Sequence, residues 1–304
     1  EDLLYQVQLP ATVGEGVRPF INIGNIRNSG FEFLASYRDN KSNGFGYQFD
    51  LTFAANKSEV LGVGVDGEDL QFPGPHVIQK GLELAEFFGF INDGIFQSQA
   101  EVDAHADQAG KAVGMLRFRD INEDGVIDED DRTNIGSPHP DVVLGLNSEF
   151  RYKAFDLVLF IDSKLGHDVW DASKTQLDFL GFISNHSTRL LDAWSPTNTG
   201  SEIPILTETN ASFNKQPSSY FLEDGSFVRL RSIALGYTLP TSFLSQVGLS
   251  NFRIYVQGQN LLTITGYGGY DYETLDADLG SLGVSPITQY PHTKGVTVGL
   301  SVKF

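Results

Sequence analysis

Apolar and polar residues alternate with a period of two along several segments of this chain. In 45–53, one face carries only apolar and aromatic side chains, namely Phe45, Tyr47, Phe49, Leu51 and Phe53. Such alternation is typical of a β-strand that has one apolar and one polar face. The same pattern recurs in 31–38, 142–152, 155–162, 252–259 and 295–304.

Two further segments complete the expected set of strands. In 227–237 the alternation is imperfect, because Arg229 and Arg231 fall on the face of Ile233. Residues 2–8 have the pattern of the end of one more strand. The sequence therefore predicts an all-β chain with eight antiparallel strands.

The connections between these strands alternate in length along the chain. The short or moderate links are 39–44, 152–154 and 239–250. The long links are 9–27, 56–140, 165–225 and 264–294. Short turns at one end of the strands and long loops at the other are typical of a transmembrane β-barrel, in which the turns are periplasmic and the loops extracellular. We therefore predict a portion of an antiparallel transmembrane β-barrel.

A soluble β-sandwich is the alternative, because its strands also alternate apolar and polar residues. Two observations favour the barrel. Loops of roughly 60 to 85 residues are uncommon inside compact soluble domains. The apolar faces are also rich in Phe and Tyr near strand ends, where barrels place their aromatic girdles. The function that would follow from a sandwich is a secreted, calcium-stabilised carbohydrate-binding module.

The composition excludes several classes of protein. The 304 residues carry 21 Lys and Arg against 39 Asp and Glu, a formal net charge of −18, and this acidity repels nucleic acids. The absence of Cys excludes disulfides, thiolate metal sites and thiol nucleophiles. No apolar run predicts a transmembrane helix. The first residues also lack the pattern of a signal peptide, so we expect a mature product or a fragment of a longer protein.

Residues 120–131, DINEDGVIDEDD, have the spacing of a calcium-binding loop. Gly125 takes the position where such a loop turns sharply. The predicted oxygen ligands are Asp120, Asn122, Asp124, the Val126 carbonyl, Asp128 and Asp131. An Asp closes the loop instead of the usual Glu, and no pair of helices flanks it. We predict that a structural Ca²⁺ stiffens a long extracellular loop here; the alternatives are a solvated acidic turn and a magnesium site.

The last strand ends in an arrangement that resembles the signal read by the outer-membrane assembly machinery. Its positions are filled by the polar Thr297, followed by Gly299, Val302 and the terminal Phe304. The alternative is an ordinary closing strand that happens to end in Phe.

Catalysis is not expected from this sequence. The six His are scattered, and neither HExxH nor GxSxG occurs. Ligand contact is a less specific hypothesis. Its basis is that the faces of sugar rings stack on aromatic side chains. The candidate rings in the long loops are Trp170, Trp194, Tyr267, Tyr270 and Tyr272. For each of them the alternative is that the ring packs the loops or faces a partner protein.

Several motifs, taken in order, resemble the C-terminal part of SusC/RagA-type TonB-linked outer-membrane proteins of Bacteroidetes. They are NIGNIRNSGFEFLASYR (22–38), FFGFINDGIFQSQAEV (87–102), the segment from FRDINEDGVID to LGHDVWD (118–171), AWSPTNTGSEIP (193–204), YFLEDGSFVRLRSIALGYTLP (220–240), LSNFRIYVQGQNLLTITGYGGYDYE (249–273) and the closing Phe304. The segment 75–86 departs from the family pattern.

The resemblance implies a fold, a function and partners. The parent protein would be an outer-membrane barrel of roughly 22 strands with a plug in its lumen, and this chain would supply about the last eight strands, without the plug domain or the TonB box. It would import glycans or peptides with energy relayed by the TonB complex, and a SusD-like lipoprotein would capture the ligand outside.

Overall fold

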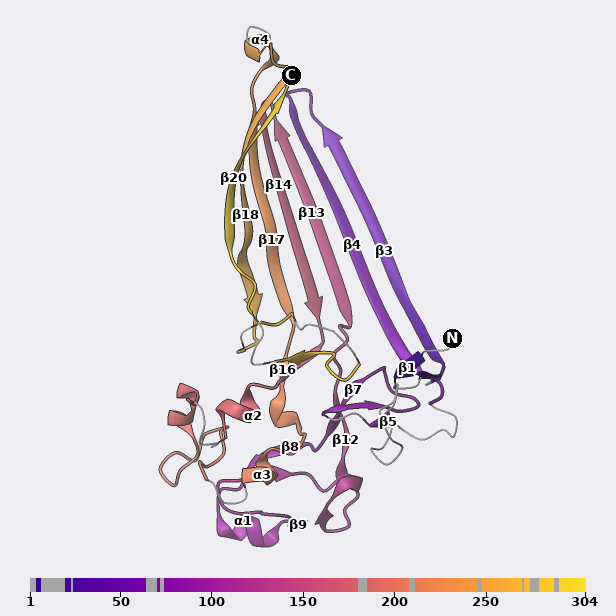
Figure 1. Ribbon diagram of the computed structural model, residues 1–304, viewed down its shortest axis with the longest axis vertical. Coiled ribbons are helices and arrows are strands. Elements are labelled where there is room, and N and C mark those ends of the chain that lie inside the picture. Colours follow the sequence, from indigo (N-terminus) through magenta and orange to yellow (C-terminus); the bar gives the residue numbers. More distant parts are fainter. Residues whose placement is uncertain are drawn as a thin grey trace.

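A computed structural model of the chain describes residues 4–6, 20–22, 24–63, 70–71, 74–179, 185–207, 211–244, 248–269, 271–273, 279–286 and 290–304. Its principal element is a seven-stranded antiparallel sheet with the spatial order β20-β18-β17-β14-β13-β4-β3 (Figure 1). The strands are β3 (Ile26–Asn40), β4 (Phe45–Val60), β13 (Val142–Tyr152), β14 (Phe155–Leu165), β17 (Phe227–Thr238), β18 (Asn251–Thr265) and β20 (Gly295–Lys303). All seven overlap predicted strands, although β3, β4 and β18 extend well beyond the predicted 31–38, 45–53 and 252–259. The all-β, antiparallel prediction is therefore confirmed.

The expected eighth strand does not join this sheet. Strand β1 (Leu4–Gln6) pairs instead with β2 (Phe20–Asn22) in a separate two-stranded sheet. Within the described residues, β3 and β20 are the two edges of the large sheet, which is therefore open.

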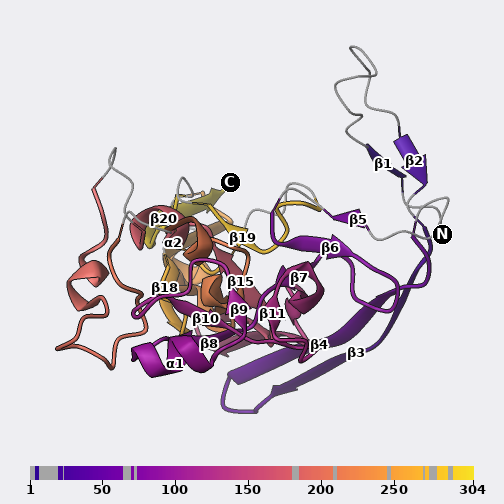
Figure 2. The ribbon, with the colours of Figure 1, turned by 90° about the horizontal axis from the view of Figure 1, so that it is seen from below.

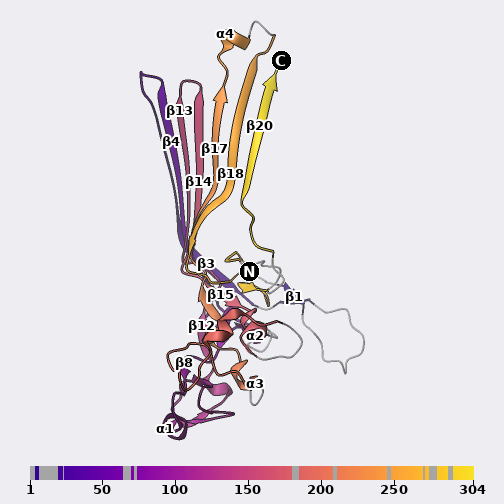
Figure 3. The same ribbon diagram turned by 90° about the vertical axis from the view of Figure 1, so that its left-hand side faces the viewer.

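One face of the large sheet is apolar and uncovered. On β20, for example, Val296, Val298 and Leu300 are 69%, 70% and 65% exposed. The described part of the chain contains no second sheet packed against this face, and Figure 3 shows the strands standing clear of the loops. A β-sandwich would bury such a face against its other sheet. The arrangement therefore agrees with a barrel wall and not with the sandwich.

Aromatic rings gather on the apolar face next to the short turns. Phe45 and Tyr47 have ring centroids 5.8 Å apart at the start of β4, and Phe155 and Tyr237 have centroids 4.7 Å apart at the turn end of β14 and β17. Phe49 meets Phe150 edge-on at 5.6 Å. Such a band is typical of the interfacial girdle of a membrane barrel.

The imperfect alternation in 227–237 has a structural cause. The registers of β17 with both β14 and β18 shift next to Arg231, as they do at a β-bulge. The shift changes the face on which later side chains lie. Arg229 therefore lies opposite Asp162 on the polar face, whereas Ile233 lies opposite Leu159 on the apolar face.

The connections are sorted by length between the two ends of the sheet. The turns at 41–44 and 153–154 and the segment with α4 (Thr241–Leu244) lie at the end near the C-terminus (Figure 1). The described parts of 61–141, 166–226 and 266–294 lie at the opposite end, and we refer to them together as the loop layer. The predicted division into short turns and long loops is confirmed for these connections, whereas the predicted long link 9–27 lies mostly outside the described residues.

The loop layer contains short elements in small sheets. In the first connection these are β5 (Leu70–Gln71), β6 (His76–Ile78), β7 (Glu86–Gly89), β8 (Asn92–Ile95), α1 (Gln99–Ala104), β9 (Asp107–Gln108), β10 (Leu116–Phe118), β11 (Val126–Ile127), the 3₁₀ turn η2 (Glu129–Asp131) and β12 (Thr133–Gly136). The others are β15 (Asp168–Asp171), α2 (Lys174–Leu177), η3 (Thr188–Asp192), α3 (Ala211–Asn214), η4 (Ser219–Phe221), β16 (Leu222–Asp224) and β19 (Val284–Ser285). Figure 2 shows these elements over the end of the large sheet, with β1 and β2 set to one side.

A hydrophobic core lies in the loop layer and joins its three connections. Phe87 comes from the first connection, Trp170 and Phe221 come from the second, and Val284 from the third packs against them. The sheet β16-β15-β19 likewise pairs strands of the second and third connections. The loop layer is therefore a packed unit, in which each long connection depends on the others.

Candidate functional site

The polar face of the large sheet carries hydrogen-bonded side chains along neighbouring strands. Asp50 on β4 accepts hydrogen bonds from Ser36 on β3 (2.5 Å), from Gln48 (3.0 Å) and from Asn147 on β13 (3.3 Å). These partners lie on the polar face because the register places Ser36 and Asn147 opposite Asp50. A row of acceptors and amides is suited to contact with water, a polar ligand or a plug.

Arg229 connects the sheet to the loop layer. Its side chain is 1% exposed and makes two hydrogen bonds to Asp162 on β14, at 3.1 and 2.6 Å. It also forms an ion pair at 2.8 Å with Glu273, which belongs to the third long connection. Glu273 lies 3.3 Å from His292, whose Nδ1 in turn lies 2.5 Å from Asp271. The buried guanidinium of Arg229 therefore attaches the third long connection to the polar face of β14 and β17.

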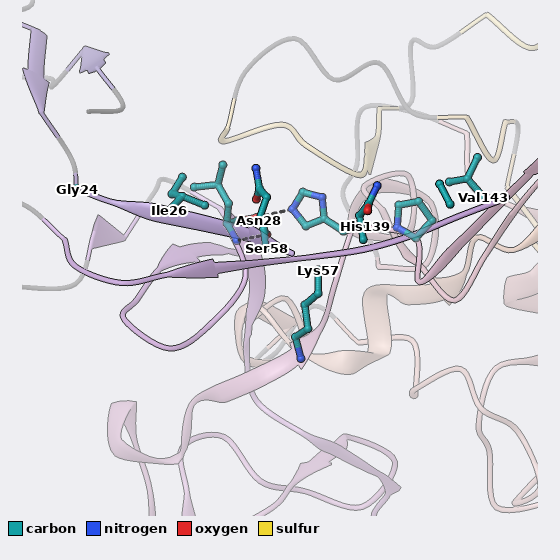
Figure 4. Close-up of a pocket in the computed structure, with 11 residues that line it drawn as sticks. Gly24, Ile26, Asn28, Lys57, Ser58, His139 and Val143 are labelled. Carbon is teal, nitrogen blue, oxygen red and sulfur yellow. Dashed lines mark hydrogen bonds between the residues drawn. The ribbon is translucent and has the colours of Figure 1, made fainter. Parts of the chain in front are cut away.

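A cavity of about 580 Å³ lies where the sheet meets the loop layer (Figure 4). Asn28 from β3, Ser58 from β4 and His139 from the first long connection line it, together with apolar groups such as Val143. The His139 Nε2 lies 2.7 Å from the Leu84 carbonyl, and the Ser58 hydroxyl accepts a hydrogen bond from the Leu84 amide. The sequence did not predict this cavity, because its walls come from four segments that are far apart in the chain.

Buried carboxyl groups in the loop layer have altered pKa values. Burial raises the pKa of Glu86, one of whose oxygens has no hydrogen-bond partner among the described residues. Burial also raises the pKa of Asp168, although the Ser137 amide donates a hydrogen bond to it. A hydrogen bond from Ser226 lowers the pKa of Asp224. Nothing in the arrangement of these described carboxyl groups resembles a nucleophile beside a general base.

The acidic loop 120–131 is shaped by its own carboxylates. Asp120 accepts from the Gly125 amide at 2.9 Å, Asn122 from the Asp124 amide at 3.0 Å, and Asp131 from the amides of Ile121 and Asp128. Asp131 is fully buried. Among the described residues no group of three or more His, Asp or Glu side chains converges as metal ligands do. Calcium at this loop stays a prediction.

Three of the predicted aromatic residues are buried and do not form an open binding surface. Trp170, Trp194 and Tyr267 are only 6%, 5% and 8% exposed. The Trp194 indole donates a 2.8 Å hydrogen bond to Gln97, and Trp170 packs against Phe221 with centroids 5.0 Å apart. Other side chains cover these rings, so a sugar cannot stack on Trp170 or Trp194 in this conformation. The contacts of both rings agree with the alternative role, in which they pack the loops.

Two further candidate rings have different surroundings. Tyr272 packs against Phe227 with centroids 4.3 Å apart, and its hydroxyl lies 3.5 Å from Arg229. It therefore belongs to the contact that fixes the third connection. Tyr270 lies outside the described residues.

The residues of the predicted assembly signal lie on the last strand. Val302 and Phe304 are 42% and 90% exposed on the apolar side of β20. Gly299 faces the other way and lies opposite Tyr255 on β18, whose ring covers it. A Cβ at position 299 would lie 2.2 Å from the Tyr255 ring, so the glycine has a packing role independent of any recognition.

The chain is similar to known receptors over its whole length, although no family model matches it. It is 33% identical to TonB-dependent receptor P3 of Formosa agariphila and 27% identical to TonB-dependent receptor SusC of Bacteroides thetaiotaomicron. It covers 31% and 29% of those proteins, and thus spans about a third of the length of the relatives that it matches.

The fold also has solved counterparts. The RagAB peptide transporter aligns with the whole chain at a TM-score of 0.80 and 21% identity, and the chain covers 32% of that protein. The RagAB peptide importer in its open-open state aligns with a TM-score of 0.77. No helix among the described residues is long and apolar enough to cross a membrane.

Proposed function

We propose that this chain, which belongs to the SusC/RagA type of TonB-dependent receptors, forms the C-terminal part of an outer-membrane barrel that imports oligomeric nutrients. The observation that carries this proposal is the open antiparallel sheet, with its exposed apolar face, its aromatic band and the described parts of three long connections at one end. An outward-facing apolar band of this kind is what a membrane barrel presents to lipid. The relatives are named as receptors, which supports transport over catalysis.

In this proposal the polar face lines the lumen and the loop layer lies outside the cell. Residues such as Asp50 and Asn147 would contact a plug formed by another part of the receptor. Energy would reach that plug through TonB. The open edges of β3 and β20 would pair with other strands of the same barrel, because unpaired edges have a row of free backbone donors and acceptors.

We further propose that a SusD-like lipoprotein covers the loop layer. Leu191 and Tyr290, 90% and 81% exposed, project from it in the described structure. Large apolar side chains at an exposed surface are common in protein interfaces. The proposed cargo is a glycan or a peptide, and the likeness of the fold to the RagAB peptide transporter supports the peptide.

The proposal is tested in cells that carry the complete receptor. Uptake of labelled oligosaccharides and oligopeptides is compared in the parent strain, in a strain without the receptor and in a strain without TonB. We expect the same cargo to fail to enter both deletion strains, and the receptor to fractionate with the outer membrane. Undiminished uptake of every cargo, or a receptor found in the soluble fraction, would contradict the proposal.

A further inference from the structure

The cavity between the sheet and the loop layer lies over small residues of the polar face. Ala54 on β4 lines it, and Val143 on β13 lies directly opposite Ala54. Gly30 on β3 lies opposite Asn56, and a Cβ at position 30 would lie 1.9 Å from the Asn56 amide oxygen. The absent side chain of Gly30 thus leaves room for Asn56, and the short side chain of Ala54 leaves the space above β4 open.

The wall that comes from the first long connection is fixed by hydrogen bonds. Leu84, His139 and Pro140 form this wall. The Nε2 of His139 donates to the Leu84 carbonyl at 2.7 Å, because a carbonyl oxygen can only accept. The Leu84 amide donates to the Ser58 hydroxyl of β4 at 3.4 Å. The connection is therefore attached to the sheet beside the cavity, which is formed before any ligand binds.

The cavity is accessible in the described structure. Asn28 on β3 and Asn56 on β4 are exposed, and Val143 is 39% exposed. The Asn56 side-chain nitrogen donates a long hydrogen bond of 3.4 Å to Glu32. A molecule that enters from the polar side of the sheet can therefore reach both amides and an aliphatic side chain.

The lining presents no counter-ion to a charged ligand. Among the described residues that line the cavity, Lys57 is the one Lys, Arg, Asp or Glu. Figure 4 shows the Lys57 side chain on the other side of β4 from Asn28 and His139. This agrees with the period of two, because Lys57 lies between Asn56 and Ser58 along the strand and so faces the opposite way. The lining therefore suits an uncharged ligand.

We propose that the cavity is a subsite for an uncharged inner segment of a peptide cargo, and this assignment rests on the proposed import function. An aliphatic side chain of the peptide packs against Ile26, Leu84 and Val143, which line the cavity together. The amide of Asn28 offers a donor and an acceptor, which are the two groups that a peptide backbone needs. The described lining contains no Phe, Tyr or Trp ring on which a sugar could stack.

The place of the cavity along β4 favours the cargo over the plug as its occupant. The strand begins with Phe45 at a short turn and ends with Val60 at the loop layer. The cavity lies against residues 54–58, near the loop end, whereas Asp50, which would contact the plug, lies closer to the turn. A cargo that enters through the loop layer from outside the cell therefore reaches the cavity before it reaches the plug.

The test uses the complete receptor in detergent and two pentapeptide probes with an acetylated amino terminus and an amidated carboxyl terminus. One probe has a central leucine flanked by serines, and in the other an asparagine of similar size replaces the leucine. Binding is measured by isothermal titration to the wild type, to Ala54→Leu and to the matched control Ala55→Leu. Ala54 lines the cavity, whereas Ala55 lies opposite Phe31 on the apolar face.

We expect the leucine probe to bind the wild type and Ala55→Leu at least about tenfold more tightly than the asparagine probe, because its side chain loses apolar surface to the cavity. In Ala54→Leu, whose larger side chain fills the cavity, both probes should bind equally weakly. Equal binding of the two probes to the wild type overturns the assignment without any variant, so a folding defect cannot mask the answer. A preference that persists in a folded Ala54→Leu receptor also overturns it.

A thiol placed in the cavity shows whether the space is open in the complete receptor. The chain contains no Cys, so Asn28→Cys adds a single thiol to it. Leu191→Cys is the control, because Leu191 is 90% exposed and lies outside the cavity. We expect a water-soluble maleimide to label both variants above the level of the unsubstituted receptor, and the leucine probe to slow only the labelling of Asn28→Cys.

Two results of the labelling would overturn the proposal. An Asn28→Cys receptor that is not labelled without ligand would mean that another part of the receptor, such as the plug, fills the cavity. Protection by maltoheptaose and not by the leucine probe would assign the cavity to a sugar.

The uptake assay in cells separates this subsite from the import function. If peptides enter the cells through the receptor but the two probes bind alike, the subsite is wrong and the import function stands. If no cargo depends on the receptor, the import function itself fails.

Discussion

Arg253 on β18 forms an ion pair with Asp156 on β14 across the whole width of the strand between them. Its Nε lies 3.1 Å from one carboxylate oxygen and its Nη2 lies 2.5 Å from the other. The intervening residue on β17 is Gly236, and a Cβ there would lie 2.4 Å from the guanidinium and 2.5 Å from the carboxylate. The missing side chain of one strand therefore allows its two neighbours to be linked on the polar face.

Replacement of Gly236 should break this link. We expect Gly236→Val to displace Arg253 and to lower the free energy of unfolding by about 1–3 kcal/mol, as overpacking does. Unfolding in urea of the detergent-refolded receptor measures the change. Gly295→Val is the matched control on another strand, because a Cβ there meets only the Gln259 amide oxygen at 3.9 Å. Equal effects of the two substitutions would contradict the role of Gly236.

Two arginines near Asp162 allow a second test. Arg229→Met leaves Asp162 and Glu273 without their buried cation, and we expect a loss of about 3–5 kcal/mol. Arg231→Met removes a side chain that is 55% exposed and 3.4 Å from the same Asp162, so the loss should stay below about 1 kcal/mol. Limited proteolysis between β18 and β20 should accelerate only in Arg229→Met. Comparable losses in both variants would exclude Arg229 as the anchor.

Glu86 should make the stability of the loop layer depend on pH. Burial raises its pKa in the folded protein, so the folded state binds its proton more tightly than the unfolded chain does. The stability that this proton provides is complete below the unfolded pKa and is lost as the pH rises through the folded pKa. Glu86→Gln should therefore melt at a higher temperature than the wild type at pH 7.5, with a smaller difference near pH 4.

The control for this prediction is Glu129→Gln. The Glu129 side chain is 72% exposed and pairs with Arg132 at the surface. We expect its melting temperature to follow that of the wild type at both pH values. If Glu86→Gln behaves in the same way, the pKa of Glu86 is not raised enough to matter.

We propose that the loop 120–131 binds Ca²⁺, and terbium luminescence tests this directly. Asp120 retains one buried oxygen without a partner among the described residues, which a cation would satisfy. Asp124→Asn should weaken terbium and calcium binding at least about tenfold, because it removes a ligand charge. Asp130→Asn, which lies outside the ligand positions, should bind like the wild type. The absence of calcium-competed luminescence in the wild type would leave only a solvated acidic turn.

The terminal Phe304 should affect assembly more than stability. It is 90% exposed and has few contacts to lose. We expect Phe304→Ala to reduce the amount of receptor in the outer membrane several-fold in cells, whereas the purified variant refolds in detergent with an unchanged heat-modifiable shift on a gel. Lys303→Ala serves as the control. Normal membrane levels of Phe304→Ala would favour the ordinary closing strand.

The sequence alone located the strands of the large sheet and distinguished the end of the sheet with short turns from the end with long loops. Period-two alternation depends on which face of a strand is apolar, and this is a local property, so segments such as 45–53 and 142–152 were located correctly. The lengths of the links between strands then placed all the long loops at one end. The motif at 120–131 and the terminal Phe304 were also recognisable, since each lies within a short stretch of chain.

Only the tertiary structure decided how distant segments meet. The bulge at Arg231 explains an alternation that looked imperfect, and the pairing of β1 with β2 removes an expected strand from the sheet. The burial of Trp170 and the cavity lined by Ala54 and Leu84 depend on contacts between segments that are separated along the chain by many residues. The sequence shows which side chains are apolar and which are charged. Their burial depends on the distant segments that pack over them, and no local pattern encodes that packing.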